Sequence, residues 1–160
     1  MALIEIKDNM LIIKMQGIRK IGTLKSEFSI PLNIIKGASV NKKAWEKTPK
    51  FGEKELGTDL YGLYFGGLFI QESKRVFYDL KRNESAVVIE LKKAGEYQGI
   101  KAHAHITSPV YEDFSEIIIG VDSPDETVKL IEEAIQGQKI IQKAATSQVT
   151  TFLLLFLPRN

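Results

Sequence analysis

His103 and His105 are the only two histidines of this 160-residue chain, and their spacing is suited to metal chemistry. Residues two apart on a β-strand share a face, so both imidazole rings would point in one direction. Zinc takes three or four ligands, and Glu112 or Asp113 would have to complete such a site. The alternative is the polar face of an exposed hairpin. The pair marks a minor candidate for a metal-dependent enzyme, and the sequence predicts no bound metal or cofactor.

A second candidate is a basic loop that carries the only tryptophan. The loop is predicted over residues 41–60 and contains Lys42, Lys43, Trp45, Lys47 and Lys50. Lysines interleaved with aromatic residues can bind an anionic membrane, where each lysine contributes about 1 kcal/mol. The tryptophan would then lie at the level of the lipid headgroups. In the alternative, the loop is solvated and its tryptophan packs over an open end of a β-barrel.

A third candidate is the run of six large apolar residues at 152–157. Such a run is expected to be covered rather than left in water. It could pack on the domain, add a strand to the sheet edge of a neighbour, or contact a membrane, which it is too short to span. It could also be a non-native extension. The run therefore predicts a contact without choosing its partner.

Composition excludes several other classes of function. The chain has no cysteine, which removes disulfides, thiolate metal sites and cysteine catalysis. A net charge of +2 is too small to predict nucleic-acid binding. Residues 1–5 lack the basic region of a signal peptide, and no apolar run is long enough to span a membrane. We therefore expect a cytoplasmic protein with no nucleic-acid partner.

The elements that must position these residues are mostly strands. Residues 3–14 alternate around an Asp-Asn turn and predict a tight hairpin. Further strands are predicted at 26–30 and 33–40, with a bend at Pro31. The segments 61–70, 75–80 and 86–91 are predicted to follow one another as an antiparallel meander. On two of these strands the apolar residues alternate, which places Val76, Tyr78 and Leu80 on one face and Val87, Ile89 and Leu91 on one face.

One helix is predicted to follow the β-branched strand 117–121. Ser123 and Pro124 are a typical N-cap and first helical residue, and Gly137 is predicted to end the helix. Val128, Ile131 and Ile135 form an apolar stripe that would pack on a sheet. Beyond this helix, residues 139–145 are predicted to form a short second helix and residues 150–157 a strand. This gives a domain over 1–137 and an apolar extension over 138–160.

Five segments together carry a resemblance to a known family. In order they are FSIPLNIIKGA (28–38), LGT (56–58), RVFYDL (75–80), AVVIEL (86–91) and VDSPDETV (121–128). With this order and spacing the chain resembles a family of uncharacterised bacterial proteins with a pleckstrin-homology-like (PH-like) domain. The resemblance implies a mainly β (α+β) fold, an antiparallel barrel of two orthogonal sheets capped by one C-terminal helix. Residues 95–113 look like an insertion into this pattern.

The resemblance implies no catalytic residues, because PH-like domains are mostly binding or assembly modules. We therefore predict a non-catalytic module that binds a protein partner or self-associates through exposed sheet edges and the apolar extension. The alternative is a peripheral membrane module that uses the Trp45 lysine loop and the extension.

Overall fold

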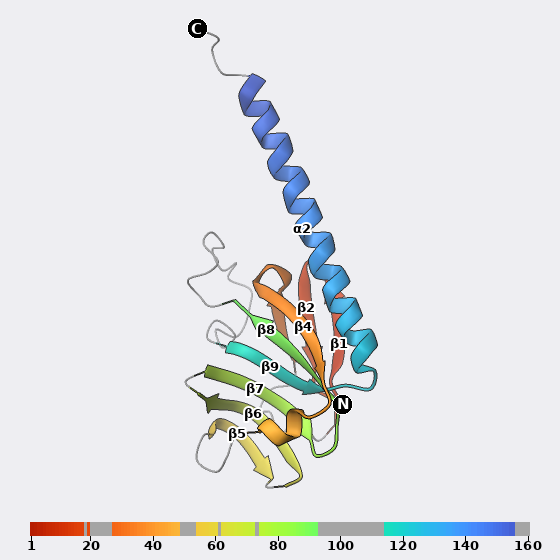
Figure 1. Cartoon of the computed structure of the whole chain (residues 1–160), viewed down its shortest axis with the longest axis vertical. Coiled ribbons are helices and arrows are strands. Elements are labelled where there is room, and N and C mark those ends of the chain that lie inside the picture. Colours follow the sequence, from red (N-terminus) through yellow and green to blue (C-terminus); the bar gives the residue numbers. More distant parts are fainter. Residues whose placement is uncertain are drawn as a thin grey trace.

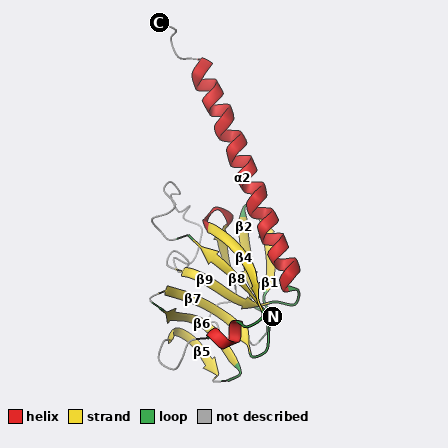
Figure 2. Ribbon diagram, viewed as in Figure 1, coloured by secondary structure: helices red, strands yellow, loops and turns green. Residues whose placement is uncertain are grey.

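The protein is mainly β, with one antiparallel sheet, one mixed sheet and one long C-terminal helix (Figures 1 and 2). The structure is a computed structural model and describes residues 1–17, 19, 27–48, 54–60, 62–72, 74–92 and 114–155. The predicted α+β class, with two sheets and a C-terminal helix, is confirmed. The predicted insertion at 95–113 lies outside the described residues.

The smaller sheet has three antiparallel strands in the order β1-β2-β3. They are β1 (Leu3–Lys7), β2 (Met10–Lys14) and β3 (Glu27–Pro31). Asp8 and Asn9 connect the first two with φ of 51° and 60°. Two positive φ values are what a tight two-residue hairpin needs, so the predicted hairpin is confirmed. Strand β3 ends at Pro31 and the 3-10 turn η1 (Leu32–Ile34) leads to the second sheet.

The larger sheet has six strands in the order β4-β8-β9-β7-β6-β5. They are β4 (Ile35–Asn41), β5 (Lys54–Leu60), β6 (Tyr64–Gln71), β7 (Lys74–Lys81), β8 (Ala86–Leu91) and β9 (Phe114–Gly120). Strand β9 lies between β7 and β8, parallel to the first and antiparallel to the second. The late strand of the chain is thus a central strand of the sheet.

This topology corrects two predictions. The two sheets do not close into a barrel, and β8 does not continue a meander from β7. The meander is interrupted because β9 lies between the two strands, and its residues Ile117, Ile118 and Ile119 are all buried. A strand that is apolar on both faces is stable in the middle of a sheet, with a neighbour on each edge. The all-antiparallel arrangement is therefore wrong at the β7–β9 pair.

Residues 54–60 were expected in a loop and instead form β5. Gly57 has φ of 140°, and a Cβ there would overlap the backbone of Gly66 and Gly67 on β6. The glycines of this region therefore allow two strands to approach closely. Glycine is also common in loops, so the sequence pattern alone does not distinguish a strand here from a loop. The start of the basic loop forms the 3-10 turn η2 (Ala44–Lys47).

Helix α2 (Pro124–Leu155) begins where it was expected. The Thr127 N–H and hydroxyl both donate to the Ser123 carbonyl at 2.9 Å, and Asp125 and Glu126 occupy the first turn. The predicted end at Gly137 is wrong, because Gly137 is not among the residues with positive φ and the helix continues through it. The predicted strand at 150–157 is wrong as far as Leu155, and residues 139–145 belong to the same helix.

Two groups of buried side chains hold this fold together. The main core lies between the two sheets and the first half of α2, and includes Leu11, Phe77, Ile117 and Ile131. A second cluster lies on the other face of the larger sheet, and its members include Phe65, Phe69, Tyr78, Leu80 and Ile118. The predicted faces of β7 and β8 are confirmed, since Val76, Tyr78 and Leu80 share the second cluster and Val87, Ile89 and Leu91 share the main core.

Helix α2 also covers one edge of the larger sheet. Strand β4 is an edge strand, and the Glu132 carboxylate accepts the backbone N–H of Ala38 at 2.6 Å. A covered edge is protected from pairing with another chain. In the part of the chain that the structure describes, no helix combines the length and the apolar composition needed to cross a membrane.

Candidate functional site

The predicted basic residues lie at the end of β4. Lys42 and Lys43 form a turn and are exposed, and Lys47 is exposed on η2. The Lys43 N–H donates to Asn41 Oδ1 at 2.9 Å. Lys50 lies outside the described residues. The structure therefore brings together three of the four predicted lysines on one surface segment.

Trp45 is half-buried against the second cluster rather than free in this loop. Its ring meets Phe65 edge to face, with 5.4 Å between the centroids. Its carbonyl accepts the Thr48 hydroxyl at 2.8 Å, and the Lys47 carbonyl accepts the Gln71 side-chain amide at 2.8 Å. The ring contact favours the alternative in which the tryptophan packs on the domain, because moving the indole into a headgroup layer would separate it from Phe65.

The predicted histidine pair, His103 and His105, lies outside the described residues. Within the ranges that the structure does describe, no group of three or more histidine, aspartate or glutamate side chains is arranged to hold a metal ion.

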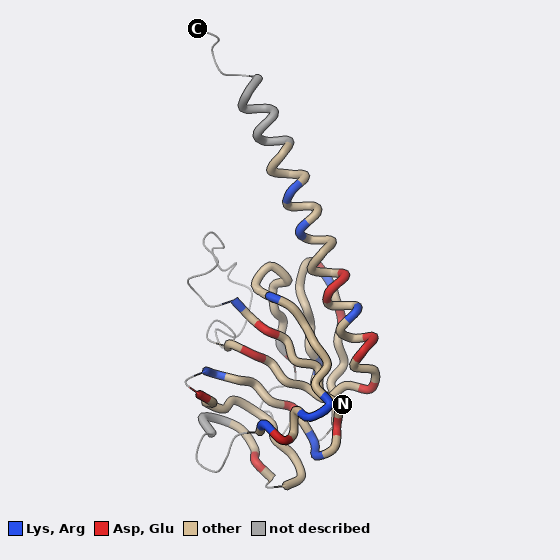
Figure 3. The backbone as a smooth tube through the Cα atoms, in the orientation of Figure 1, with Lys and Arg blue, Asp and Glu red and all other residues tan. Residues whose placement is uncertain are grey.

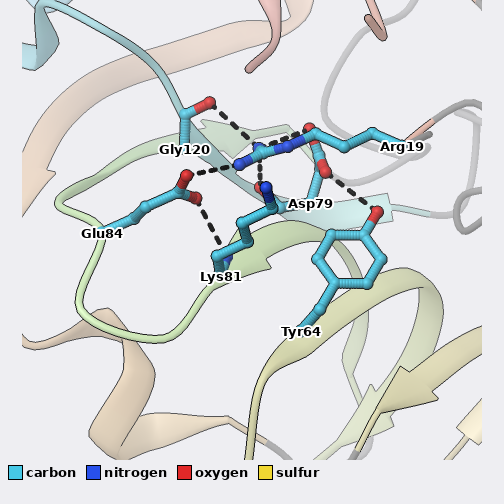
Figure 4. Close-up of polar contacts among 6 residues, drawn as sticks. All are labelled: Arg19, Tyr64, Asp79, Lys81, Glu84 and Gly120. Carbon is cyan, nitrogen blue, oxygen red and sulfur yellow. Dashed lines mark hydrogen bonds and ion pairs between the residues drawn. The ribbon is translucent and has the colours of Figure 1, made fainter. Parts of the chain in front are cut away.

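The main polar feature is a buried ion pair that the sequence patterns did not reveal. Arg19 and Asp79 are both buried, and Arg19 Nη1 donates to Asp79 Oδ2 at 3.1 Å (Figure 4). The same nitrogen lies 3.5 Å from the Gly120 carbonyl oxygen, and Nη2 donates to Glu84 Oε1. The Arg19 guanidinium thus joins β7, the turn after it and the end of β9.

Two further groups complete this cluster. The Tyr64 hydroxyl donates to Asp79 Oδ1 at 3.0 Å, and the Lys81 N–H donates to Glu84 Oε2 at 2.9 Å. Gly120 leaves the space that the Glu84 carboxylate occupies, because a Cβ there would overlap Glu84 Oε2. Both oxygens of Asp79 are therefore engaged within the protein, an arrangement suited to holding a fold together.

Burial sets the protonation behaviour of the cluster. Burial raises the pKa of Asp79, and the Arg19 guanidinium and the Tyr64 hydroxyl partly offset this rise. The pKa of Tyr64 is raised above its ordinary value, first by burial and then by the charge of Asp79. The sequence signal for this site was Asp79 itself, a charged residue on the core-facing side of an otherwise apolar strand.

Replacing Tyr64 with phenylalanine tests the cluster through pH. We expect the free energy of unfolding at neutral pH to fall by about 1.5–3 kcal/mol, because a hydrogen bond to a charged acceptor is lost. A tyrosine in the unfolded chain ionises near pH 10, whereas folded Tyr64 keeps its proton. The stabilisation is therefore complete below pH 10 and is lost as the pH rises above it.

Urea denaturation followed by circular dichroism measures both proteins across this range. The difference in unfolding free energy between the wild type and Tyr64→Phe should shrink above about pH 10. A difference that stays constant from about pH 8 to pH 11 would show that the pKa of Tyr64 is not raised by its place beside Asp79 in the folded protein.

The most exposed apolar surface of the described chain lies on the second half of α2, which extends away from both sheets (Figure 1). Ile131 and Ile135 are buried in the main core, but Ile140 is 60% exposed and Ile141 is 67% exposed. We call residues 138–155 the projecting half of α2. Two exposed isoleucines on this part of the helix are an apolar surface that the described residues leave uncovered.

The projecting half also differs in charge from the half that packs on the sheets. Lys139 and Lys143 are exposed, and residues 138–155 contain no acidic residue (Figure 3). The sequence over 152–155 is apolar, so the predicted apolar extension coincides with this half. The strand predicted within this segment is wrong as far as Leu155, because helix α2 runs through it.

Comparisons with protein-family models, with curated proteins and with solved structures each gave no match.

Proposed function

We propose that this chain is a non-catalytic assembly module that self-associates through the projecting half of α2. The observation that carries the proposal is the exposure of Ile140 and Ile141 on a helix that has left the sheets. Buried apolar surface stabilises an interface by roughly 25 cal/mol per Å², so covering these two large side chains with a second copy would be favourable. The Arg19 cluster has a structural role in this proposal, because its carboxylates face partners within the protein.

The PH-like relationship stays part of the proposal. Two sheets and a C-terminal helix support it, and so does the mostly antiparallel pairing. The parallel pairing of β7 with β9 departs from it. A cytoplasmic location stays a prediction. Membrane contact also stays a prediction, and it would use Lys42, Lys43, Trp45, Lys47 and Lys50. The packing of the tryptophan on Phe65 weakens the case for membrane contact.

Light scattering with size-exclusion chromatography tests self-association on the full chain and two variants. The wild type should have a mass well above 18.0 kDa at micromolar concentration. Ile141→Lys should return the mass towards 18.0 kDa, because a charge placed in an apolar contact must be desolvated without a partner.

Leu63→Lys is the matched control. Leu63 is 65% exposed, almost the same as Ile141, but it lies on the turn between β5 and β6. This variant should keep the wild-type mass. A wild type of 18.0 kDa at every concentration, or an equal effect of both lysine variants, would contradict the proposal.

A further inference from the structure

We infer that the partner of α2 is a second copy of this chain, paired antiparallel, so that the projecting half of each copy lies along the packed half of the other. This inference rests on the proposed function and specifies its geometry. Three observations on α2 carry it: the distribution of charge, the position of exposed apolar residues, and the small residues between them.

Charge is divided unequally along α2. The first third contains Asp125, Glu126, Glu132 and Glu133 against the single Lys129, and all five are exposed. The projecting half contains Lys139 and Lys143 and no acid. Figure 3 shows this change of sign along the helix. One α2 therefore carries acidic residues in its first third and basic residues from its middle onwards, and these opposite charges attract each other.

Antiparallel pairing uses this division and parallel pairing opposes it. Two parallel copies would place acids beside acids and lysines beside lysines, which is unfavourable. Two antiparallel copies place Lys139 and Lys143 beside the acidic third of the partner. The helix dipoles also oppose each other in this arrangement, which is favourable.

A seam of apolar and small residues runs along α2 at the spacing of paired helices. Its members lie four, three, four and three residues apart and are Leu130, Ala134, Gly137, Ile141 and Ala144. Leu130 is 43% exposed although it lies on the packed half, Ala134 is partly buried against the main core, and Ile141 is 67% exposed. A seam that spans both halves is what an antiparallel partner needs, because the packed half of each copy must also offer a contact.

The sizes of the seam residues fix one register. When Leu130 of each copy lies opposite Ile141 of the other, Ala134 lies opposite Gly137 at the crossing point. The large exposed side chains then cover each other, and small residues let the two backbones approach closely. Gly137 has space around it, since a Cβ there would meet nothing within 4 Å. A glycine in mid-helix, which is otherwise unfavourable, has a use in this interface.

Single-cysteine cross-linking tests this register cleanly, because the chain has no cysteine of its own. Leu130→Cys and Ile141→Cys chains, one carrying a size tag, are mixed and oxidised by oxygen with a copper catalyst. The antiparallel pair predicts a mixed disulfide of the two chains as the main product. Leu63→Cys mixed with Ile141→Cys is the control and should give little product.

The outcomes separate the inference from the function on which it rests. Disulfides that join Leu130→Cys to itself and Ile141→Cys to itself, in protein that keeps its associated mass, would overturn the antiparallel geometry alone. A wild-type mass of 18.0 kDa would overturn self-association and the geometry with it.

Charge reversal gives a second readout. The variant Lys139→Glu/Lys143→Glu makes the projecting half acidic like the first third, so antiparallel pairing should weaken about tenfold in dissociation constant at low salt. Parallel pairing would leave the dissociation constant unchanged, because lysine facing lysine becomes glutamate facing glutamate. An unchanged constant would therefore contradict the inference.

Discussion

Replacing Arg19 with methionine is expected to lower the free energy of unfolding by about 3–5 kcal/mol. The substitution keeps much of the apolar stem but leaves the Asp79 carboxylate buried without a counter-charge. Asp79 is fully buried and Arg19 nearly so, so solvent cannot compensate. Chemical denaturation followed by circular dichroism at neutral pH measures the loss.

Lys14→Met is the matched control for this experiment. Lys14 Nζ lies 2.7 Å from Glu5 Oε2, closer than Arg19 Nη1 lies to Asp79 Oδ2, but both side chains are substantially exposed. Exposed pairs contribute about 0–1 kcal/mol, so this variant should be nearly as stable as the wild type. Equal losses in the two variants would show that the burial of Arg19 adds nothing.

The stability loss of Arg19→Met is also expected to depend on pH in a definite direction. Burial already raises the pKa of Asp79, and removing Arg19 removes the main group that opposes this rise. A carboxyl group with a raised folded pKa favours the folded state at low pH, and this advantage is lost as the pH rises past its ordinary value of 3.8. The deficit of Arg19→Met should therefore grow between about pH 4 and pH 7.

Replacing Ile131 with alanine is expected to lower the free energy of unfolding by about 2–5 kcal/mol. Ile131 is fully buried where α2 packs on the main core, and the shortened side chain leaves a cavity between helix and sheets. The same substitution at Ile140, which is 60% exposed on the opposite face of the same helix, should change stability by less than about 0.5 kcal/mol.

Thermal and urea unfolding of both variants at low protein concentration measures this contrast. The comparison separates the half of α2 that belongs to the fold from the half that does not. A large loss in Ile140→Ala under dilute conditions would show that the projecting half packs on its own domain.

Local sequence patterns predicted the local features of this fold. The Asp8–Asn9 turn, the faces of β7 and β8 and the start of α2 at Pro124 all follow from rules that act within a few residues. The end of α2 did not follow, because Gly137 ends a helix only when the backbone turns to positive φ. Glutamines and lysines with good helical propensity surround it and carry the helix onwards.

Features set by distant residues could not be predicted in this way. Arg19 and Asp79 are 60 residues apart in the sequence, and no local pattern links them. The position of β9 between β7 and β8 depends on a parallel pair that periodicity does not encode. The packing of Trp45 likewise depends on Phe65, which lies on another strand.

The position of β9 has a consequence for the order in which the protein folds. As the chain leaves the ribosome, β7 and β8 emerge before Phe114–Gly120, and each has an edge that only β9 satisfies. Until that strand arrives, the nascent larger sheet is divided into two parts, β5-β6-β7 and β4-β8. Unpaired edges of this kind can capture other chains. The insertion of β9 therefore completes the larger sheet, and the main core, which also includes Ile131 and Ile135 of α2, can form only after more than three quarters of the chain has been synthesised.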